Sequence, residues 1–170
     1  STLDEYLEQG AKCAGTVLVC ELKPQRDTLR DDILWNESVA SLKAHGLYDP
    51  ERVIFISFDR YLCDKIAREA PQFTNQYLHK DATPEDLHES GINGIDFRDK
   101  QLLEDTTITR RAHDLGMSVN VWTVDADSTM RVMIGQGVDF LTTNEPLLAR
   151  ELLGEQELRS SSCSGTTARN

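Results

Sequence analysis

The sequence predicts an α/β fold built on a parallel sheet, because short apolar runs alternate with helical patterns along most of the chain. Runs rich in β-branched and aromatic residues recur six times, with polar or helical stretches between them. The runs alternate only partly in polarity, as is typical of strands that are covered on both faces. The expected strands are residues 16–23, 52–59, 73–79, 91–97, 118–125 and 138–143.

Two architectures contain such a sheet. Six strand–helix units in about 150 residues match the spacing of a (β/α)8 barrel, which needs roughly 250 residues for eight units. A doubly wound open sheet is the alternative. No strand is followed by a GxGxxG or Walker-type loop, which removes the commonest ligand of the open sheet but leaves that fold possible.

The residues that flank the helical stretches agree with this alternation. Thr2 followed by Glu5 is a capping-box pattern, and Thr83-Pro84 places a proline at the first position of a helix. Glycines follow three of the helical stretches, where a left-handed residue commonly ends a helix. These glycines are Gly91, Gly116 and Gly137.

One domain followed by a tail is the expected organisation. A chain of 170 residues is long enough for a single domain with a sizeable core. We assign residues 1–153 to this domain, whose last helix should begin near Pro146. Residues 154–170 end in the polar string SSSCSGTTARN, which has little apolar surface to bury, so this tail is expected to be disordered.

Charge and composition exclude several classes of partner. The formal net charge of −11 disfavours nucleic acids and anionic membranes as main partners, because both are polyanions. No apolar run is long enough to span a bilayer. The four cysteines form no CxxC pair, so they do not indicate a zinc site.

The segment VLVCELKP, residues 17–24, ends an apolar strand with a carboxylate and an ammonium group. Alternate side chains of a strand share a face, so Glu21 and Lys23 point the same way, about 6.6 Å apart along the strand. This spacing is too wide for a tight salt bridge and suits two groups that flank a third charge. Pro24 ends the strand, and the C-terminal ends of barrel strands carry active sites. A solvated strand end that happens to be charged explains the spacing equally well.

The two charges would suit a metal and a phosphate. A carboxylate at such a strand end is an appropriate ligand for a hard cation such as Mg²⁺ or Ca²⁺. A lysine ammonium is an appropriate partner for a phosphate oxygen. Glu21 and Lys23 are therefore the first candidate site residues.

Aromatic and hydroxyl side chains end two other expected strands. Trp122 and Val124 are expected on one face of the strand 118–125, with Trp122 near its C-terminal end. A tryptophan there can wall a ligand pocket, although an aromatic side chain in a core is the commoner case. Ser57 and Phe58 end another strand and could line the same rim. Ser57 has no evident base beside it, which favours a hydroxyl near a turn over a nucleophile.

The histidines suggest no acid–base pair. No Ser-His-Asp order and no HExxH motif is present. His79 ends a strand and could reach the rim, whereas His45, His88 and His113 fall on expected helices and should face solvent. The residues alone therefore indicate a binding site more clearly than a catalytic mechanism.

Several segments together resemble the glycerophosphodiester phosphodiesterase family. They are TLDEYLEQG, VLVCELKP, VIFISFD, GINGID, VNVWTVD and GVDFLTTNEP. That family has a (β/α)8 barrel with Glu-x-Lys on one strand, Ser-Phe on the next, Val-Trp-Thr on a later strand and Thr-Asp-x-Pro on the last. The resemblance covers roughly residues 1–153. It implies a TIM-barrel type of fold that is incomplete in this chain, with about six of the eight strands.

The resemblance also implies roles for individual residues. Glu21 would be a ligand of a divalent cation, Mg²⁺ or Ca²⁺, and Lys23 would contact the phosphate of the substrate. Trp122 would pack on the glycerol side of the substrate, with Ser57 and Phe58 as weaker candidates for the pocket. At the last motif this sequence departs from the family pattern, because Asn144 stands where the family usually has aspartate.

A larger departure concerns the family's His-Arg motif, its further acidic metal ligands and its second histidine, none of which is present. The resemblance implies a metal-dependent hydrolase that converts glycerophosphodiesters to glycerol 3-phosphate and an alcohol. The chain as given would then be an incomplete, inactive portion, which needs an N-terminal segment or partner strands to close the barrel. A phospholipase D-like lyase and a non-catalytic remnant that binds a phosphorylated ligand or a partner chain are the alternatives.

Overall fold

Six parallel strands form one curled sheet in a computed structural model of the chain, in which residues 2–163 are described, with side chains to residue 155. Neighbours in the sheet are neighbours in the sequence, in the order β1-β2-β3-β4-β5-β6. The strands are β1 (Leu18–Glu21), β2 (Val53–Ser57), β3 (Thr74–Tyr77), β4 (Gly94–Arg98), β5 (Ser118–Trp122) and β6 (Phe140–Leu141). This arrangement is that of an incomplete (β/α)8 barrel, and it confirms both the fold class and the six strands that the sequence predicts.

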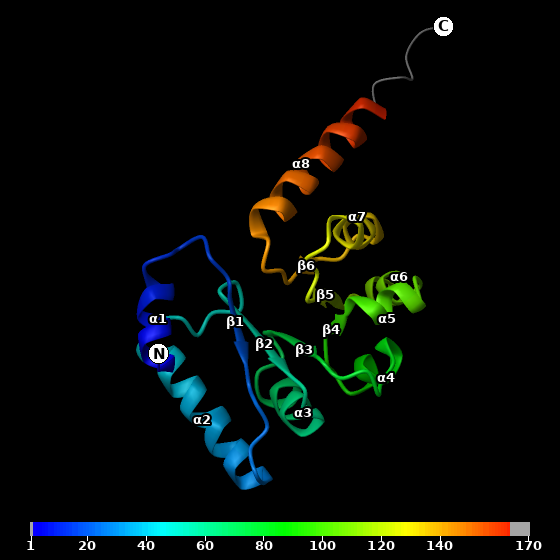
Figure 1. Ribbon diagram of the computed structural model, residues 1–170. Helices are drawn as coiled ribbons and strands as arrows, with labels where there is room; N and C mark the ends of the chain where they lie inside the picture. The colour runs from blue at the N-terminus through cyan, green and yellow to red at the C-terminus, as the bar shows by residue number, and fades with distance from the viewer. Residues whose placement is uncertain (1, 164–170) are drawn as a thin grey trace, which may run out of the picture.

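The helices are α1 (Leu3–Ala11), α2 (Thr28–Ala44), α3 (Arg60–Glu69), α4 (Pro84–Glu89), α5 (Asp99–Glu104), α6 (Ile108–Asp114), α7 (Asp127–Gln136) and α8 (Pro146–Cys163). Helices α2 to α7 connect the strands and cover the outer face of the sheet, whereas α1 precedes the first strand and α8 follows the last one (Figure 1). The capping boxes expected at Thr2 and Thr83 are both formed. No helix among the described residues is both long and apolar enough to cross a membrane.

The outer face of the sheet packs against the helices in two apolar clusters. In the first, the ring of Phe55 on β2 packs edge-on against Trp35 of α2, with ring centroids 5.2 Å apart, and against Phe73, at 5.3 Å. In the second, Val119 and Val121 of β5 are fully buried under the later helices. Because successive side chains of a strand point to opposite faces, the alternate residues of each strand point into the barrel.

The inner face is polar and closely packed in its centre. Gln76, Asp96 and Asn120 lie on β3, β4 and β5, and at most 3% of each residue is exposed. Gln76 Nε2 donates to Ser118 Oγ at 3.0 Å, and Asn120 Nδ2 donates to Gln76 Oε1 at 3.4 Å. The curl of the sheet buries these side chains against one another, so the middle of the barrel is covered with the six strands that residues 2–163 form.

Some exposed apolar side chains lie at the two flanks of the sheet. Val17 and Val19 are both 42% exposed beside and on β1, and Phe140 on β6 is 38% exposed. Because β1 and β6 are the first and last strands of the sheet, each has one unpaired edge. Both open edges of the half-barrel therefore carry apolar side chains that further strands could cover.

Two expectations need correction. Val124 does not share the inner face with Trp122, because β5 ends at Trp122 and Val124 turns into the outer core, where it is 1% exposed. The last helix extends to Cys163, beyond residue 154, where the sequence predicts that a disordered tail begins. Residues 164–170 of the expected tail lie outside the described residues.

Candidate functional site

Glu21 and Lys23 lie together at the C-terminal end of β1. Leu18 and Leu22 are buried in the outer core, so alternation directs Glu21 and Lys23 to the inner face. Glu21 Oε2 and Lys23 Nζ are 3.8 Å apart, so the two groups form a long ion pair and lie closer together than the strand spacing alone predicts. The Lys23 side chain is 76% exposed and that of Glu21 is 34% exposed. Both groups remain available to a ligand.

Ser57 does not line the rim, and the expectation that it does is corrected. It continues the face of Val53 and Phe55, which pack against the helices, and it is fully buried. Its Oγ donates to the Leu22 carbonyl oxygen at 2.7 Å and accepts from the Asp59 amide at 3.0 Å. Ser57 therefore fixes the backbone between Glu21, the last residue of β1, and Lys23.

A buried aspartate faces the same interior and was missed by the sequence analysis. Asp96 on β4 is 2% exposed, and its Oδ1 has no hydrogen-bond partner within the described part of the chain. Burial, with a further contribution from the negative charge of Glu21, raises the pKa of Asp96 to about 7. The signal in the sequence was an aspartate inside the apolar run GINGIDF, where an acid is costly to bury.

Trp122 and Phe58 form an aromatic wall at the same end of the sheet. Their rings meet edge to face, with centroids 5.7 Å apart. Trp122 Nε1 donates to the Asp96 carbonyl oxygen at 2.9 Å, which holds the indole on β4. The guanidinium of Arg98 lies over the indole, 4.7 Å from the ring centroid. The structure thus links the tryptophan to the strand that carries the buried aspartate.

This wall bounds a cavity of about 530 Å³ at the C-terminal ends of β2 to β5. Phe58, His79, Arg98 and Trp122 are among its lining residues, so His79 does reach the rim. The imidazole Nδ1 of His79 is 3.1 Å from Asp81 Oδ1. Of the predicted site residues, Phe58 and Trp122 meet in this cavity, whereas Glu21 and Lys23 form a separate pair on β1.

The oxygen donors of this chain fit only part of a divalent-cation site. Glu21 offers an accessible carboxylate, and Asp96 adds a buried oxygen without a partner. Mg²⁺ and Ca²⁺ require about six or more oxygen ligands. In residues 2–155 no group of three or more His, Cys, Asp or Glu side chains could hold a metal ion. Glu21 and Asp96 therefore offer only part of the ligands that such a cation requires.

Asn144, in the loop after β6, bonds to the carboxylate of Asp125, in the loop after β5. Its backbone N–H and its Nδ2 donate to the two carboxylate oxygens of Asp125, at 2.8 and 2.9 Å, and Thr143 Oγ1 donates to the same group at 3.0 Å. These hydrogen bonds lower the pKa of Asp125. An aspartate at position 144 would face another carboxylate, so the asparagine suits this local arrangement.

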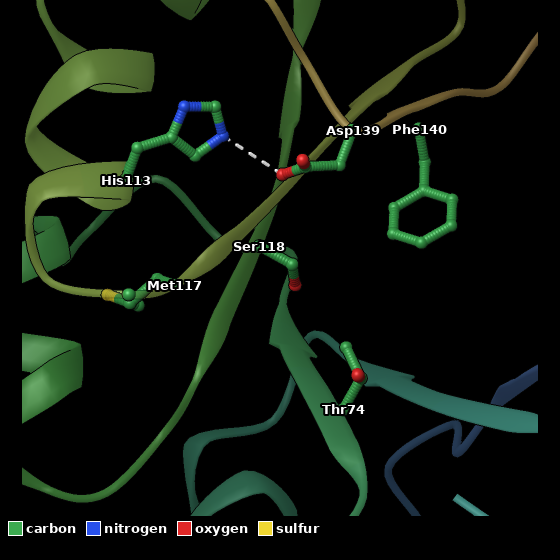
Figure 2. A pocket seen from close by; sticks show the side chains of 7 residues that line it. Thr74, His113, Met117, Ser118, Asp139 and Phe140 are labelled. Carbon is green, nitrogen blue, oxygen red and sulfur yellow. Dashed lines mark hydrogen bonds and ion pairs between the residues drawn. The ribbon is translucent and has the colours of Figure 1, made fainter. Parts of the chain in front are cut away.

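A second cavity, also of about 530 Å³, opens at the opposite end of the sheet (Figure 2). His113 of α6 points toward Asp139, which precedes β6, and their Nε2 and Oδ2 atoms are 3.0 Å apart. Asp139 Oδ2 also accepts from the Val119 amide at 2.7 Å. His113 is exposed as expected, and its hydrogen bond to Asp139 links a helix to the segment that precedes β6. In barrels this N-terminal end serves stability.

Comparison with known proteins agrees with the fold and the motifs. The model of the glycerophosphoryl diester phosphodiesterase family matches residues 1–148. A search of the curated proteins finds no match. A glycerophosphodiester phosphodiesterase from Parabacteroides distasonis is 33% identical, with a TM-score of 0.87, over 92% of this chain and 65% of that chain.

Two further structures show the same fold at lower identity. A phosphodiesterase from Oleispira antarctica, in complex with the product sn-glycerol-3-phosphate, is 22% identical, with a TM-score of 0.74, over 90% of this chain and 61% of that one. A glycerophosphodiester phosphodiesterase from Thermotoga maritima is 17% identical, with a TM-score of 0.63, over 93% of this chain and 63% of that one. The chain thus spans less than two thirds of these proteins. By its family match, it belongs to the glycerophosphoryl diester phosphodiesterase family.

Proposed function

We propose that the protein hydrolyses glycerophosphodiesters to glycerol 3-phosphate and an alcohol, and that this chain supplies one half of the active site. The observation that carries the proposal is the pair Glu21 and Lys23, both accessible on the inner face at the C-terminal end of β1. Membership of the family and the product complex of the Oleispira structure support the reaction.

Each site residue has a chemical task in this proposal. Lys23 binds a phosphate oxygen as a flexible point charge. Glu21 is one ligand of Mg²⁺ or Ca²⁺, a cation whose charge would balance that of the phosphodiester. Trp122 and Phe58 pack against the glycerol side of the substrate. Ser57 positions Glu21 and Lys23 through its hydrogen bond to the Leu22 carbonyl and does not touch the substrate.

We propose further that two strands from outside this chain complete the barrel and the active site. The open edges of β1 and β6 and the exposed Val19 and Phe140 support this step. A cavity of about 380 Å³ also lies beside β1, lined mainly by apolar side chains of β1, α1 and α2. Such an edge can accept a further strand through its free backbone groups. The added segment, N-terminal or from a partner chain, would bring the remaining metal ligands and the acid–base groups.

A non-catalytic remnant is the second candidate function. The observation in its favour is that Lys23 is accessible, while no group of three or more His, Cys, Asp or Glu side chains in residues 2–155 could hold a metal ion. In that case the protein would bind a phosphorylated ligand or a partner chain without turnover.

Hydrolysis assays separate the two functions. For the isolated chain with Mg²⁺ or Ca²⁺ we expect no turnover of glycerophosphocholine or glycerophosphoglycerol, because half of the site is absent. The protein expressed from its complete reading frame should hydrolyse at least one of them. Glu21→Ala should then reduce kcat by about 100-fold or more, since charge stabilisation is lost.

Lys12→Gln is the matched control for Lys23→Gln, because Lys12 is exposed at the end of α1, away from the site. Only Lys23→Gln should lower kcat/KM. Turnover by the isolated chain that disappears in Glu21→Ala would refute the half-site. No turnover by the complete protein would favour the remnant.

A further inference from the structure

The cavity beside Trp122 has an unusual charge for this protein. The chain as a whole carries a net charge of −11. The cavity is lined by three permanent cations, Lys80, Arg98 and Lys100, and by one carboxylate, Glu104. Lys100 Nζ lies 3.7 Å from Glu104 Oε1, so these two charges offset each other. The cavity therefore has two cations in excess.

Arg98 and Lys80 are the two uncompensated cations. Neither has a carboxylate within ion-pair distance in the part of the chain that the structure describes. Arg98 is held by its stacking on Trp122, which leaves the N–H groups at the edge of its guanidinium free. A planar, positioned guanidinium next to a second cation is the arrangement that binds phosphate or carboxylate.

The same stacking disfavours a cationic ligand. Quaternary ammonium groups are commonly bound on the face of a tryptophan. Here Arg98 lies over the Trp122 ring at 4.7 Å and occupies one face with its own positive charge. A choline group would lose that face and meet electrostatic repulsion from Arg98 and Lys80.

The volume of the cavity indicates the size of ligand that it can hold. At about 530 Å³ it falls among pockets that hold drug-sized ligands, about 300–1000 Å³, and exceeds the needs of glycerol alone. Glycerol packed on Trp122 would fill only part of this cavity, whose lining also includes Lys80 and Lys100. That remaining space is bordered by positive charge, and in a phosphodiester the alcohol is the other substituent available to fill it.

We infer that this cavity is a subsite for an anionic alcohol, so that the preferred substrates are glycerophosphodiesters whose alcohol carries a phosphate. The inference rests on the proposed function, because it names the substrate class of the same site. Arg98 and Lys80 are its specificity-determining residues. They bind the second anionic group and take no part in the bond cleavage.

Binding measurements test the subsite independently of turnover. The protein from its complete reading frame is titrated calorimetrically in EDTA with glycerophosphoinositol 4-phosphate, glycerophosphoinositol and glycerophosphocholine. The first two ligands differ only in the added phosphate. We expect the 4-phosphate to bind about five- to tenfold more tightly than glycerophosphoinositol, and glycerophosphocholine to bind most weakly.

Charge variants identify the responsible residues. The double variant Arg98→Gln/Lys80→Gln should bring the affinity ratio of the two inositol ligands to about one. Arg98→Lys/Lys80→Arg keeps both charges and should retain most of the preference. The matched control is Lys12→Gln/Arg110→Gln, which removes the same charges from exposed positions of α1 and α6 outside the cavity and should leave the ratio unchanged.

The outcomes separate this inference from the proposed function. An affinity ratio of one in the unsubstituted protein, or a ratio that Arg98→Gln/Lys80→Gln leaves intact, overturns the subsite even if glycerophosphodiesters are hydrolysed. A preserved preference for the 4-phosphate without any hydrolysis in Mg²⁺ or Ca²⁺ supports the subsite and refutes the enzyme. Absence of binding by either inositol ligand overturns the subsite.

Discussion

The burial of the Asp96 carboxylate is unfavourable, and the sequence around Asp96 does not predict this cost. Asp96 lies on an inner face beside Gln76 and Asn120, which bond to each other, while its own Oδ1 has no partner among the described residues. An ionised carboxylate without hydrogen bonds is unfavourable in a dry interior. Burial therefore raises the pKa of Asp96 to about 7. The nearby negative charge of Glu21 contributes to that shift.

The raised pKa predicts a dependence of stability on pH. Between the ordinary value of 3.8 and about 7, the folded state binds the Asp96 proton and the unfolded state releases it. The contribution of Asp96 is therefore most favourable at low pH, and stability falls as the pH rises through this interval. Asp96→Asn should remove that slope and raise the free energy of unfolding at pH 8 by about 2–4 kcal/mol.

Urea unfolding of the metal-free protein from its complete reading frame, at pH 4 and pH 8, measures this effect. Asp114→Asn, at the exposed end of α6, is the control, and it should change stability by less than about 0.5 kcal/mol. An Asp96→Asn protein that is no more stable at pH 8 would contradict the assigned burial cost.

Among the elements, β4 packs closely between β3 and β5 at its first residue, Gly94. Gly94 pairs with Gln76 on β3 and with Ser118 on β5. A Cβ atom at Gly94 would lie 2.5 Å from Ser118 Oγ and 2.7 Å from Gln76 Cγ, closer than side chains can pack. The absence of a side chain lets Gln76 Nε2 reach Ser118 Oγ across β4.

Gly94→Ala should therefore destabilise the sheet by about 1–3 kcal/mol, the usual cost of overpacking a core. Chemical denaturation provides the measurement. Gly135→Ala is the matched control, because Gly135 lies in α7 with open space around its Cβ position. Alanine there favours helix and should stabilise by up to about 1 kcal/mol. A Gly94→Ala protein as stable as the parent would show that Ser118 and Gln76 move aside at no cost.

At the scale of the whole molecule, the open barrel is expected to lower the stability of the isolated chain. Val17, Val19 and Phe140 remain exposed at its flanks. Each large apolar side chain left in water forfeits roughly 1.5–3 kcal/mol, which is considerable beside a domain stability of about 5–15 kcal/mol. The centre of the inner face is already covered, so the deficit lies at the edges and not throughout the interior.

We therefore expect the isolated 170-residue chain to associate, or to unfold without a sharp transition, at ordinary temperatures. Sedimentation velocity and a thermal melt followed by circular dichroism test this directly. The protein from its complete reading frame is the comparison, and it should melt cooperatively. A cooperative melt of the isolated chain as a monomer would contradict the need for further strands.

The sequence by itself determined the strands and the placement of Glu21 and Lys23, because both depend on local periodicity. The six apolar runs became six parallel strands, and a repeat of two residues put the two charges of β1 on one face. The family motifs are also local, and the match over residues 1–148 confirms that interpretation.

Only the tertiary structure decided which side chains are buried and which meet. Ser57 turned outward because β2 places it with Val53 and Phe55, while Asp96 became buried through neighbours on β3 and β5. The stacking of Arg98 on Trp122 joins residues 24 positions apart in sequence. Burial, pKa and ring contacts depend on residues that are distant along the chain, and the curl of the sheet brings those residues together.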